Sequence, residues 1–255
     1  MIETDKFDYD VLEKRIKQES DRKTFAKVFD NQSINAVHSL ANKGLFDVLE
    51  HIVSTGKEAH VFAATDVSGN TRAVKIFKKE TTDFKRMNEY IVDDRRFQNL
   101  RKDRRNLVFA WAKKEYKNLL LANRANLSVP VPLGIKENVI VMEFISENNK
   151  PAKQLKETKS TKKELETYLE QIIDFMAKLY LAGLVHADLS EYNILVQKKK
   201  LVIIDFAQAV LLNHPKAREF FERDVTNIAN FFSKKGIKIS FEELYAKIKA
   251  HKNEL

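Results

Sequence analysis

The stretch VHADLSEYNILV, residues 185–196, decides the fold, because it places polar side chains at a fixed spacing before an apolar strand. His186, Asp188 and Asn193 stand in the order H-x-D-L-x-x-x-N. A second apolar strand follows, and its end, IIDF, carries Asp205. Two short apolar runs joined by a polar turn predict a hairpin. The sequence therefore brings two carboxylates and an amide to the ends of one hairpin.

This pattern is typical of the catalytic and metal-binding loops of kinase-fold enzymes. A hydroxyl that accepts a phosphoryl group needs a carboxylate beside it, and Asp188 suits that role. A triphosphate needs cations between its oxygens, and Asn193 and Asp205 supply the hard oxygen ligands that such cations prefer. The alternative is a buried histidine with a few carboxylates at loop ends. Four matched positions, a matched hairpin and a second matched aspartate argue against that alternative.

A lysine upstream fits the same chemistry. RAVKIFK, residues 72–78, places Lys75 in an apolar strand, where it could hold the α- and β-phosphates of a nucleotide. A buried lysine needs a carboxylate partner, because desolvation would otherwise neutralise it. Glu115 is the best candidate for this partner, and Glu89 and Asp93 are the alternatives. Lys75 could instead be a surface lysine, but its apolar neighbours favour a central strand.

The stretch HIVSTGKEAHVF, residues 51–62, resembles a phosphate-binding loop with few glycines. It is not a Walker loop, because His51 stands where that motif requires its first glycine and Glu58 where it requires Ser or Thr. It fits the kinase loop G-x-G-x-x-G-x-V better, with Gly56 as the middle glycine and Val61 as the valine.

Small residues replace the two outer glycines of this loop. Ser54 and Ala59 stand at those positions. The hydroxyls of Ser54 and Thr55 and the charge of Lys57 supplement the backbone amides, and Gly56 keeps a permissive backbone near the phosphates. The loss of two glycines predicts a stiffer loop than in ordinary kinases.

The apolar stretch NVIVMEFI, residues 138–145, predicts a buried strand that leads to a hinge. Adenine is normally read by backbone groups at such a hinge, so Glu143 and Ile145 are the expected contacts. Met142 would then line the back of the nucleotide pocket. As an isolated segment, this stretch is simply a core strand.

Strands dominate residues 50–145 and helices dominate residues 160–255, which predicts an α+β, bilobal, protein-kinase-like fold. The expected parts are an N-terminal helical extension over 1–49 that packs on the core, an N-lobe over 50–145 with a small sheet and one helix, and a truncated helical C-lobe over 146–255.

Periodicity and capping residues predict the elements within these parts. Gly44 and Gly183 stand where helices end, and Ser240 with Glu243 forms a capping box for the last helix. The expected helices cover 8–30, 33–43, 45–52, 107–122, 164–182 and the chain after 206; a hairpin covers 60–78, strands cover 192–197 and 200–206, and 149–163 is an exposed, lysine-rich loop.

The composition excludes several classes of protein. The 255 residues are 44% apolar and 32% charged, enough for one large domain or two lobes. The absence of cysteine excludes a disulfide scaffold and a thiolate metal site. No apolar run is long enough to span a membrane, and the first ten residues are too polar for a signal peptide. The sequence therefore predicts a cytoplasmic protein without a membrane partner.

The net charge of +9 is unevenly distributed. Residues 72–117 hold 15 Lys and Arg against 7 Asp and Glu, a net charge of +8. Such an excess suggests an anionic partner, which could be nucleic acid, phosphate or an acidic protein. The alternative is a solvated helical face.

Taken together, STGKEA, AVKIF, HADLSEYNIL and IDFAQA resemble the RIO family of atypical protein kinases over most of residues 25–232. STGKEA in place of GKES resembles the first RIO subfamily. About 50 residues precede the loop, too few for the winged-helix domain of the second subfamily. The resemblance, the lack of cysteine and the high charge favour an archaeal source.

The resemblance implies a serine/threonine kinase or ATPase that uses ATP with Mg²⁺ or Mn²⁺. It implies Asp188 as catalytic base, Asn193 and Asp205 as metal ligands, and Lys75 as the phosphate lysine. It also implies an aspartyl-phosphate on Asp205, serine autophosphorylation, and work on a precursor of the small ribosomal subunit. The basic segment 83–106 matches a flexible segment of the family and is the expected contact with that precursor. We expect a monomer.

Three features depart from ordinary protein kinases. Ala187 replaces the catalytic-loop arginine, and Ala207 replaces the glycine of D-F-G. No A-P-E motif follows Asp205, so the region that docks peptide substrates is missing. This favours ATP cleavage as a conformational switch over peptide phosphorylation. Asp224 could brace the catalytic loop from a following helix, or be a plain surface acid.

Two other functions compete with this one. A small-molecule phosphotransferase of the aminoglycoside or choline kinase type also carries H-x-D-x-x-x-x-N followed by I-D, but usually has a larger, acid-rich C-terminal lobe. A catalytically inactive scaffold that binds RNA or protein is disfavoured, because every expected catalytic position is filled.

Overall fold

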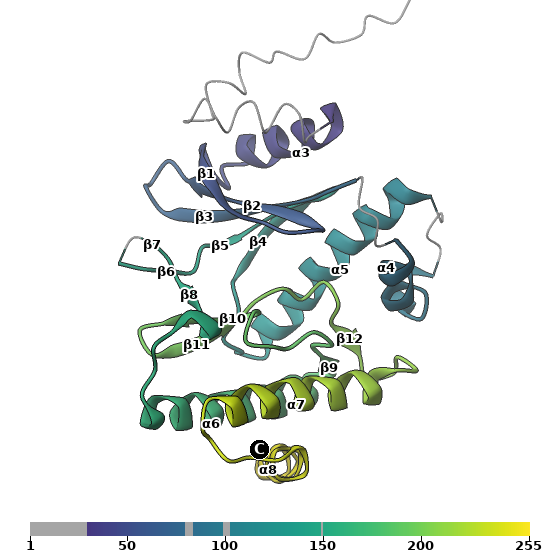
Figure 1. Ribbon diagram of the computed structural model, residues 1–255. Coiled ribbons are helices and arrows are strands. Elements are labelled where there is room, and N and C mark those ends of the chain that lie inside the picture. The colour runs from purple at the N-terminus through teal and green to yellow at the C-terminus, as the bar shows by residue number, and fades with distance from the viewer. Residues whose placement is uncertain (1–29, 80–83, 99–102, 149) are drawn as a thin grey trace, which may run out of the picture. The chain divides into compact units, whose positions relative to one another are not determined.

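The computed structural model describes residues 30–79, 84–98, 103–148 and 150–255, which form two compact units. The first unit comprises the described parts of 1–84, 102–113 and 132–144, and the second those of 85–101, 114–131 and 145–255. The division falls inside the long helix α5 (Arg104–Arg124). Strands dominate the first unit and helices the second, so the predicted α+β class is confirmed (Figure 1).

The first unit is built on one antiparallel sheet of five strands in the order β1-β2-β3-β5-β4 (Figure 1). The predicted hairpin over 60–78 and the predicted strand over 138–145 supply the three central strands of this sheet, β2, β3 and β5. The strands are β1 (Val48–Thr55), β2 (Ala59–Thr65), β3 (Thr71–Phe77), β4 (Pro132–Lys136) and β5 (Val139–Glu143).

Helix α3 (Asn31–Asn42) covers one face of the sheet. Asp30 caps its first turn by accepting the Ser33 N–H at 2.9 Å. Its apolar stripe packs against strand residues whose side chains share one face by their period of two. The resulting core contains Ile34, Val37, Leu40, Phe46, Leu49, Phe62, Val74, Ile76, Val139 and Val141.

The predicted helix over 45–52 is wrong. This stretch belongs to β1, whose residues pair with β2 from Val48 opposite Thr65 to Thr55 opposite His60. Gly44 ends α3 with φ 75°, and four residues later the chain enters the sheet at Val48. A segment this short gains more from a ladder of hydrogen bonds and from burying Leu49 in the α3 core than from one or two isolated helical turns.

Helices form most of the second unit, and α6, α7 and α8 pack together in it (Figure 1). Thr161 and Glu164 form a capping box at the start of α6, and Gly183 ends it with φ 84°. The predicted capping box of Ser240 and Glu243 is confirmed. The helical segments are α4 (Phe84–Ile91), η1 (Arg95–Phe97), η2 (Leu155–Glu157), α6 (Lys162–Leu181), α7 (Ala217–Lys234) and α8 (Phe241–Glu254).

Short strands complete this unit, and two predictions are corrected by them. The stretch 149–163 is not simply a loop: part of it pairs with β10, and Leu155 is fully buried, although the lysines are exposed as expected. The chain after 206 is helical only over α7 and α8; residues 207–216, which include β12, and residues 235–240 are not helical. The strands are β6 (Ser146–Glu147), β7 (Lys150–Pro151), β8 (Lys153–Gln154), β9 (Leu184–Val185), β10 (Ile194–Gln197), β11 (Lys200–Ile203) and β12 (Val210–Leu211).

Among the described residues, no helix is long and apolar enough to cross a membrane. The predicted helix over 8–30 lies outside the described residues except for the capping residue Asp30.

Candidate active site

The sheet register aligns predicted nucleotide-binding residues in the first unit. Ser54 pairs with Val61, and Val61 pairs with Lys75. On the neighbouring strand, Met142 pairs with Ala73, two residues before Lys75. Directly paired residues, and residues two apart on one strand, share a face of the sheet. The predicted residues that lie on the sheet face opposite α3 are therefore Ser54, Val61, Lys75 and Met142, one from each of four strands.

The predicted phosphate loop is a tight turn between β1 and β2. The Gly56 N–H donates to the Ala59 carbonyl at 2.9 Å and closes the turn. The ammonium of Lys78 donates to the Gly56 carbonyl at 2.6 Å, and Thr55 Oγ1 lies 3.1 Å from His60 Nδ1. These contacts hold the two ends of the turn together, and the greater stiffness expected from the loss of two glycines stays a prediction. Ser54, Thr55, Gly56 and Lys57 are all exposed.

Gly56 does not take the left-handed conformation that favours glycine. A Cβ atom at this position would lie 3.5 Å from the Ala59 carbonyl oxygen, which is ordinary van der Waals contact. The fold itself therefore accepts a side chain here. The sequence argument from a permissive backbone is wrong at this position, and what remains for the glycine is space for a ligand.

The other predicted nucleotide contacts have distinct surroundings. Lys75 is 8% exposed, and its ammonium lies 5.0 Å from the centre of the Phe77 ring. Glu143 pairs with Arg72, which places its side chain on the face opposite Lys75 and fits a role for its backbone. Ile145 is buried, and its carbonyl accepts the Ala152 N–H at 3.0 Å. Glu115 is buried in the second unit, and its pairing with Lys75 stays a prediction.

The catalytic loop of the second unit lies between β9 and β10. The Asn193 amide donates to the Asp188 carbonyl at 2.8 Å and to the Asp188 carboxylate at 3.1 Å. These bonds fix the Asp188 carboxylate and direct the Asn193 amide nitrogen toward it. The Asn193 amide oxygen points away from Asp188 and can therefore serve as a metal ligand. The backbone of Asn193 also accepts the Ile204 N–H at 2.9 Å, which joins this loop to the residue before Asp205.

Burial raises the pKa of Asp188, and the negative charge of Asp205 raises it further. The guanidinium of Arg86 and the hydrogen bond from Asn193 act against this shift. A carboxyl group with a raised pKa is a better proton acceptor, which suits a general base. The effect of the Asp205 charge on Asp188 also indicates where a cation would be stabilised.

Asp224 braces the catalytic loop. It is 1% exposed in α7 and accepts the N–H groups of Ala187 and Leu189, each at 2.8 Å. Arg223 donates to the Ala187 carbonyl. Ala187 has φ 65°, a conformation that non-glycine residues seldom adopt. Burial raises the pKa of Asp224 to about 7, although the two N–H donors lower it. The structure thus decides between the two interpretations of Asp224 in favour of the brace.

Asp205 also has a left-handed backbone, with φ 64°. The residue before it is held by His186, whose Nε2 lies 3.1 Å from the Ile204 carbonyl oxygen. The His186 ring also packs edge-on against Phe206. Ala207 does not have a positive φ, which explains why alanine can replace the glycine of D-F-G here.

Sequence reasoning missed Arg86, which it assigned only to a basic segment. The guanidinium lies 3.9 Å from the Asp188 carboxylate and donates to the side chain of Gln208 at 3.0 Å. Two alternatives for the partner of Lys75 are engaged nearby: Glu89 pairs with Lys216 at 2.6 Å, and Asp93 lies 4.0 Å from His214. Nothing in the local sequence around Arg86 distinguishes it from its basic neighbours.

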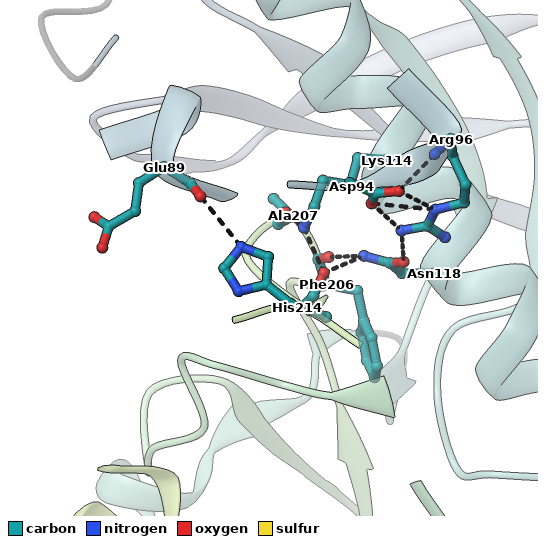
Figure 2. A network of polar contacts seen from close by, with 9 residues as sticks. Glu89, Asp94, Arg96, Lys114, Asn118, Phe206, Ala207 and His214 are labelled. Carbon is teal, nitrogen blue, oxygen red and sulfur yellow. Dashed lines mark hydrogen bonds and ion pairs between the residues drawn. The ribbon is translucent and has the colours of Figure 1, made fainter. Parts of the chain in front are cut away.

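Sequence reasoning also missed a buried polar network beside Asp205. Figure 2 shows Lys114 and Asn118 of α5 directed at backbone carbonyls of the segment that follows Asp205, with Asp94 and Arg96 behind them. The sequence argument for this stretch concerns only the neighbouring Glu115, as a candidate partner of Lys75.

The residues present fit a magnesium ion that also binds a nucleotide. No group of three or more His, Asp or Glu side chains in the described part of the chain forms a metal site by itself. Mg²⁺ bound to a triphosphate needs only one or two carboxylates, because phosphates and water complete its shell. Asp205 and the oxygen of Asn193 meet that need, and the raised pKa of Asp188 shows that negative charges already oppose one another here.

A family model described as "RIO domain" matches residues 60–244. The chain belongs to the RIO family. The match includes Lys75, Asp188, Asn193 and Asp205 and begins just after the phosphate loop. Two archaeal relatives are each named "RIO-type serine/threonine-protein kinase Rio1". That of Haloferax volcanii is 39% identical over 93% of this chain and 81% of its own, and that of Methanocaldococcus jannaschii is 41% identical over 92% and 80%. These relatives confirm the first RIO subfamily.

Among solved structures, the Rio2 kinase of Chaetomium thermophilum in an ADP/Mg²⁺-phosphoaspartate complex is similar to this RIO protein. The TM-score is 0.63 at 21% identity, with 86% of this chain and 67% of that chain covered. At this identity the likeness shows the fold, so the predicted kinase-like architecture is confirmed. RIO membership with Rio1 relatives also argues against the small-molecule phosphotransferase that the sequence left open.

Proposed function

We propose that this RIO protein is a metal-dependent serine/threonine kinase that transfers the γ-phosphoryl group of ATP. The observation that carries the proposal is the arrangement of Asp188, Asn193 and Asp205, in which Asn193 holds the Asp188 carboxylate and Asp205 raises its pKa. The family, its named relatives and the ADP/Mg²⁺ complex of a structural neighbour support the same chemistry.

Each residue has a defined task. Asp188 accepts the proton of the attacking hydroxyl, and Asn193 keeps its carboxylate oriented during the transfer. Lys75, with Ser54 in the same row of the sheet, binds phosphate oxygens. Asp205 and Asn193 hold Mg²⁺ or Mn²⁺, which when bound neutralises phosphate charge. The backbone at Glu143 and Ile145 binds adenine, and Met142 lines its pocket.

The chain could also transfer the phosphoryl group to itself. A carboxylate oxygen of Asp205 would attack the γ-phosphorus while the bond to the β–γ bridging oxygen breaks, which yields an aspartyl-phosphate and ADP. Water then cleaves the acyl phosphate and regenerates Asp205 with inorganic phosphate. This cycle makes ATP cleavage a conformational switch. A bound phosphate that survives hydroxylamine would contradict an acyl phosphate on Asp205.

The partner we propose is a cytoplasmic precursor of the small ribosomal subunit. In the basic segment 83–106, Arg86 and Arg96 already donate hydrogen bonds to the side chains of Gln208 and Asn118. The exposed side chains of Lys85, Arg95 and Arg105 are the better candidates for contact with RNA phosphates.

ATP turnover with and without small-subunit precursors tests the proposal. We expect slow turnover that the precursors accelerate, and loss of phosphoryl transfer in Asp188→Ala and Asp205→Ala. Asp205→Ala should also weaken metal-dependent ATP binding, since it removes a ligand, whereas Asp188→Ala should not. Turnover by both variants at the wild-type rate would contradict the proposal.

A further inference from the structure

Two side chains from adjacent turns of α5 hold the backbone that follows Asp205 (Figure 2). The Lys114 ammonium donates to the Ala207 carbonyl at 2.9 Å and to the Ala209 carbonyl. The Asn118 amide donates to the Phe206 carbonyl at 3.0 Å and to the Ala209 carbonyl at 2.7 Å. Four hydrogen bonds thus converge on three carbonyls of one four-residue segment.

A second layer orients these donors (Figure 2). Arg96 donates to the Asn118 oxygen at 2.9 Å, which turns the amide nitrogen toward the carbonyls. Arg96 is itself held by Asp94 at 2.6 Å, and Asp94 is 4% exposed. Burial lowers the pKa of Lys114 to about 7, and the Asp94 charge acts against this shift. The chain of hydrogen bonds therefore runs from η1 through α5 to the backbone that follows Asp205.

Such a network is costly if stability is its only purpose. Lys114 is 0% exposed, and a buried charge carries a desolvation penalty of several kcal/mol. A well-packed apolar side chain of similar volume is often at least as stabilising at such a position. The polar network also has a specific target: all four hydrogen bonds from Lys114 and Asn118 end on the residues that follow Asp205, the predicted metal ligand.

The backbone of Asp205 supplies a reason for this target. Its φ of 64° is a left-handed conformation, which costs a non-glycine residue roughly 1–2 kcal/mol. Strained conformations persist at functional sites only when the surroundings over-determine them. On one side His186 contacts the Ile204 carbonyl, and on the other Lys114 and Asn118 hold the carbonyls from Phe206 onward.

We propose that Lys114 and Asn118 are positioning residues that hold the Asp205 carboxylate in its metal-binding orientation by fixing the backbone of residues 206–209. The inference rests on the proposed role of Asp205 as a metal ligand. Neither side chain touches substrate or metal in this account.

The test compares Lys114→Met and Asn118→Ala with the exposed control Lys113→Met in the full chain. Electron paramagnetic resonance measures Mn²⁺ binding in the presence of ADP, ATP turnover measures kcat, and amide exchange measures protection of residues 206–210 without metal. We expect each test variant to lose about 10–100-fold in Mn²⁺ affinity and kcat, as substitutions behind metal ligands do. Exchange at 206–210 should accelerate, and nucleotide affinity without metal should not change.

The inference is overturned if folded Lys114→Met or Asn118→Ala binds Mn²⁺ and turns over ATP as Lys113→Met does. Should Lys114→Met fail to fold, Asn118→Ala decides, because it removes two donors and leaves the buried ion pair of Asp94 and Arg96 in place. Asp205→Ala separates the two proposals. If Asp205→Ala leaves Mn²⁺ binding unchanged, the proposed role of Asp205 fails. If Asp205→Ala loses Mn²⁺ binding but Lys114→Met and Asn118→Ala do not, only the positioning role of Lys114 and Asn118 is refuted.

Discussion

The carboxylate of Asp224 accepts the backbone N–H of Ala187 at 2.8 Å, and Ala187 has a left-handed backbone with φ 65°. One residue before Asp188, the chain is thus held in a strained conformation by a buried charge on α7. A second strained residue, Asp205, is held by the buried charge of Lys114 on α5 through the carbonyls that follow it. Both loops that carry the candidate chemistry are fixed by buried ionisable side chains that touch only backbone there.

We expect Asp224→Asn to lower both stability and kcat. An amide has one oxygen, so it can accept only one of the N–H groups of Ala187 and Leu189, and its own NH₂ opposes the other. A buried donor without an acceptor costs about 1–3 kcal/mol. Urea unfolding measures the loss of stability. Single-turnover kinetics should show slower transfer even where the variant is folded, because Asp188 is displaced.

Glu219→Gln, at an exposed acid on the same helix, is the control for this prediction. It should behave as the wild type. Asp224→Asn with unchanged unfolding and unchanged kcat would show that the brace is not needed.

The buried ammonium of Lys114 predicts a dependence of stability on pH. Desolvation lowers its pKa in the folded state from 10.5 to about 7. Between these values the unfolded chain binds the proton and the folded chain does not. The free energy of unfolding therefore increases as pH rises through this window. The contribution is lost as pH falls toward 7. The slope from one group is at most about 1.4 kcal/mol per pH unit.

Urea unfolding of the wild type and Lys114→Met across this window measures the effect. The difference in unfolding free energy between the two should change with pH, because only the wild type titrates there. Lys113→Met removes an exposed lysine and should give a constant difference from the wild type. Parallel profiles for wild type and Lys114→Met would contradict the lowered pKa.

Gly56→Ala separates a role in folding from a role in binding. The added Cβ would make only an ordinary contact with the Ala59 carbonyl, so the unfolding free energy should change little. Nucleotide affinity should fall, because the methyl group occupies space that a phosphate needs. Titration with ADP and Mg²⁺ measures this affinity.

Gly69→Ala is the opposite case and serves as the control. Gly69 has φ 81° in the β2–β3 turn, where alanine is strained by about 1–2 kcal/mol. That variant should lose stability and keep its nucleotide affinity when folded. If Gly56→Ala binds nucleotide as tightly as the wild type, the turn does not cover the phosphates.

We expect Arg86→Gln to move the acid limb of the pH–rate profile to higher pH. The guanidinium favours the ionised form of Asp188, so its loss raises the pKa of that carboxyl further above its usual value. A general base must be ionised, and a higher pKa therefore removes activity on the acid side. Because Asp205 also acts on Asp188, the profile reports the pair.

Arg86→Lys keeps a cation at this position and should restore part of the shift. Lys85→Gln removes an exposed neighbouring charge and should leave the profile unchanged. An acid limb that is identical in wild type and Arg86→Gln would mean that Arg86 does not act on Asp188.

The residues with a fixed motif could be found from the sequence. Asp188, Asn193 and Asp205 stand at the spacing that their chemistry requires, and Lys75 lies in an apolar strand whose burial pattern is legible. Asp224 could only be left as a choice between brace and surface acid, because its partners are backbone N–H groups 35 and 37 residues away along the chain. No sequence pattern encodes such partners.

Other features depend on tertiary contacts that outweigh local preference. The stretch 45–52 has helical spacing but becomes part of β1, because β2 offers a ladder and the α3 core accepts Leu49. Lys114 and Arg86 look like any lysine or arginine of a basic segment. Their roles come from the Ala207 and Ala209 carbonyls and from Asp188, which the sequence places far downstream.

Single-turnover transfer from γ-labelled ATP with Mg²⁺ tests the central claim most directly. Label on protein and in free phosphate is followed for the wild type, Asp188→Asn, Asp205→Asn and the control Asp174→Asn, whose carboxylate pairs with Lys178 on α6. The account predicts that wild type and Asp174→Asn transfer label, while the other two variants are folded but slower by about 10²–10⁴-fold. Transfer at the wild-type rate by Asp188→Asn and Asp205→Asn would contradict the account.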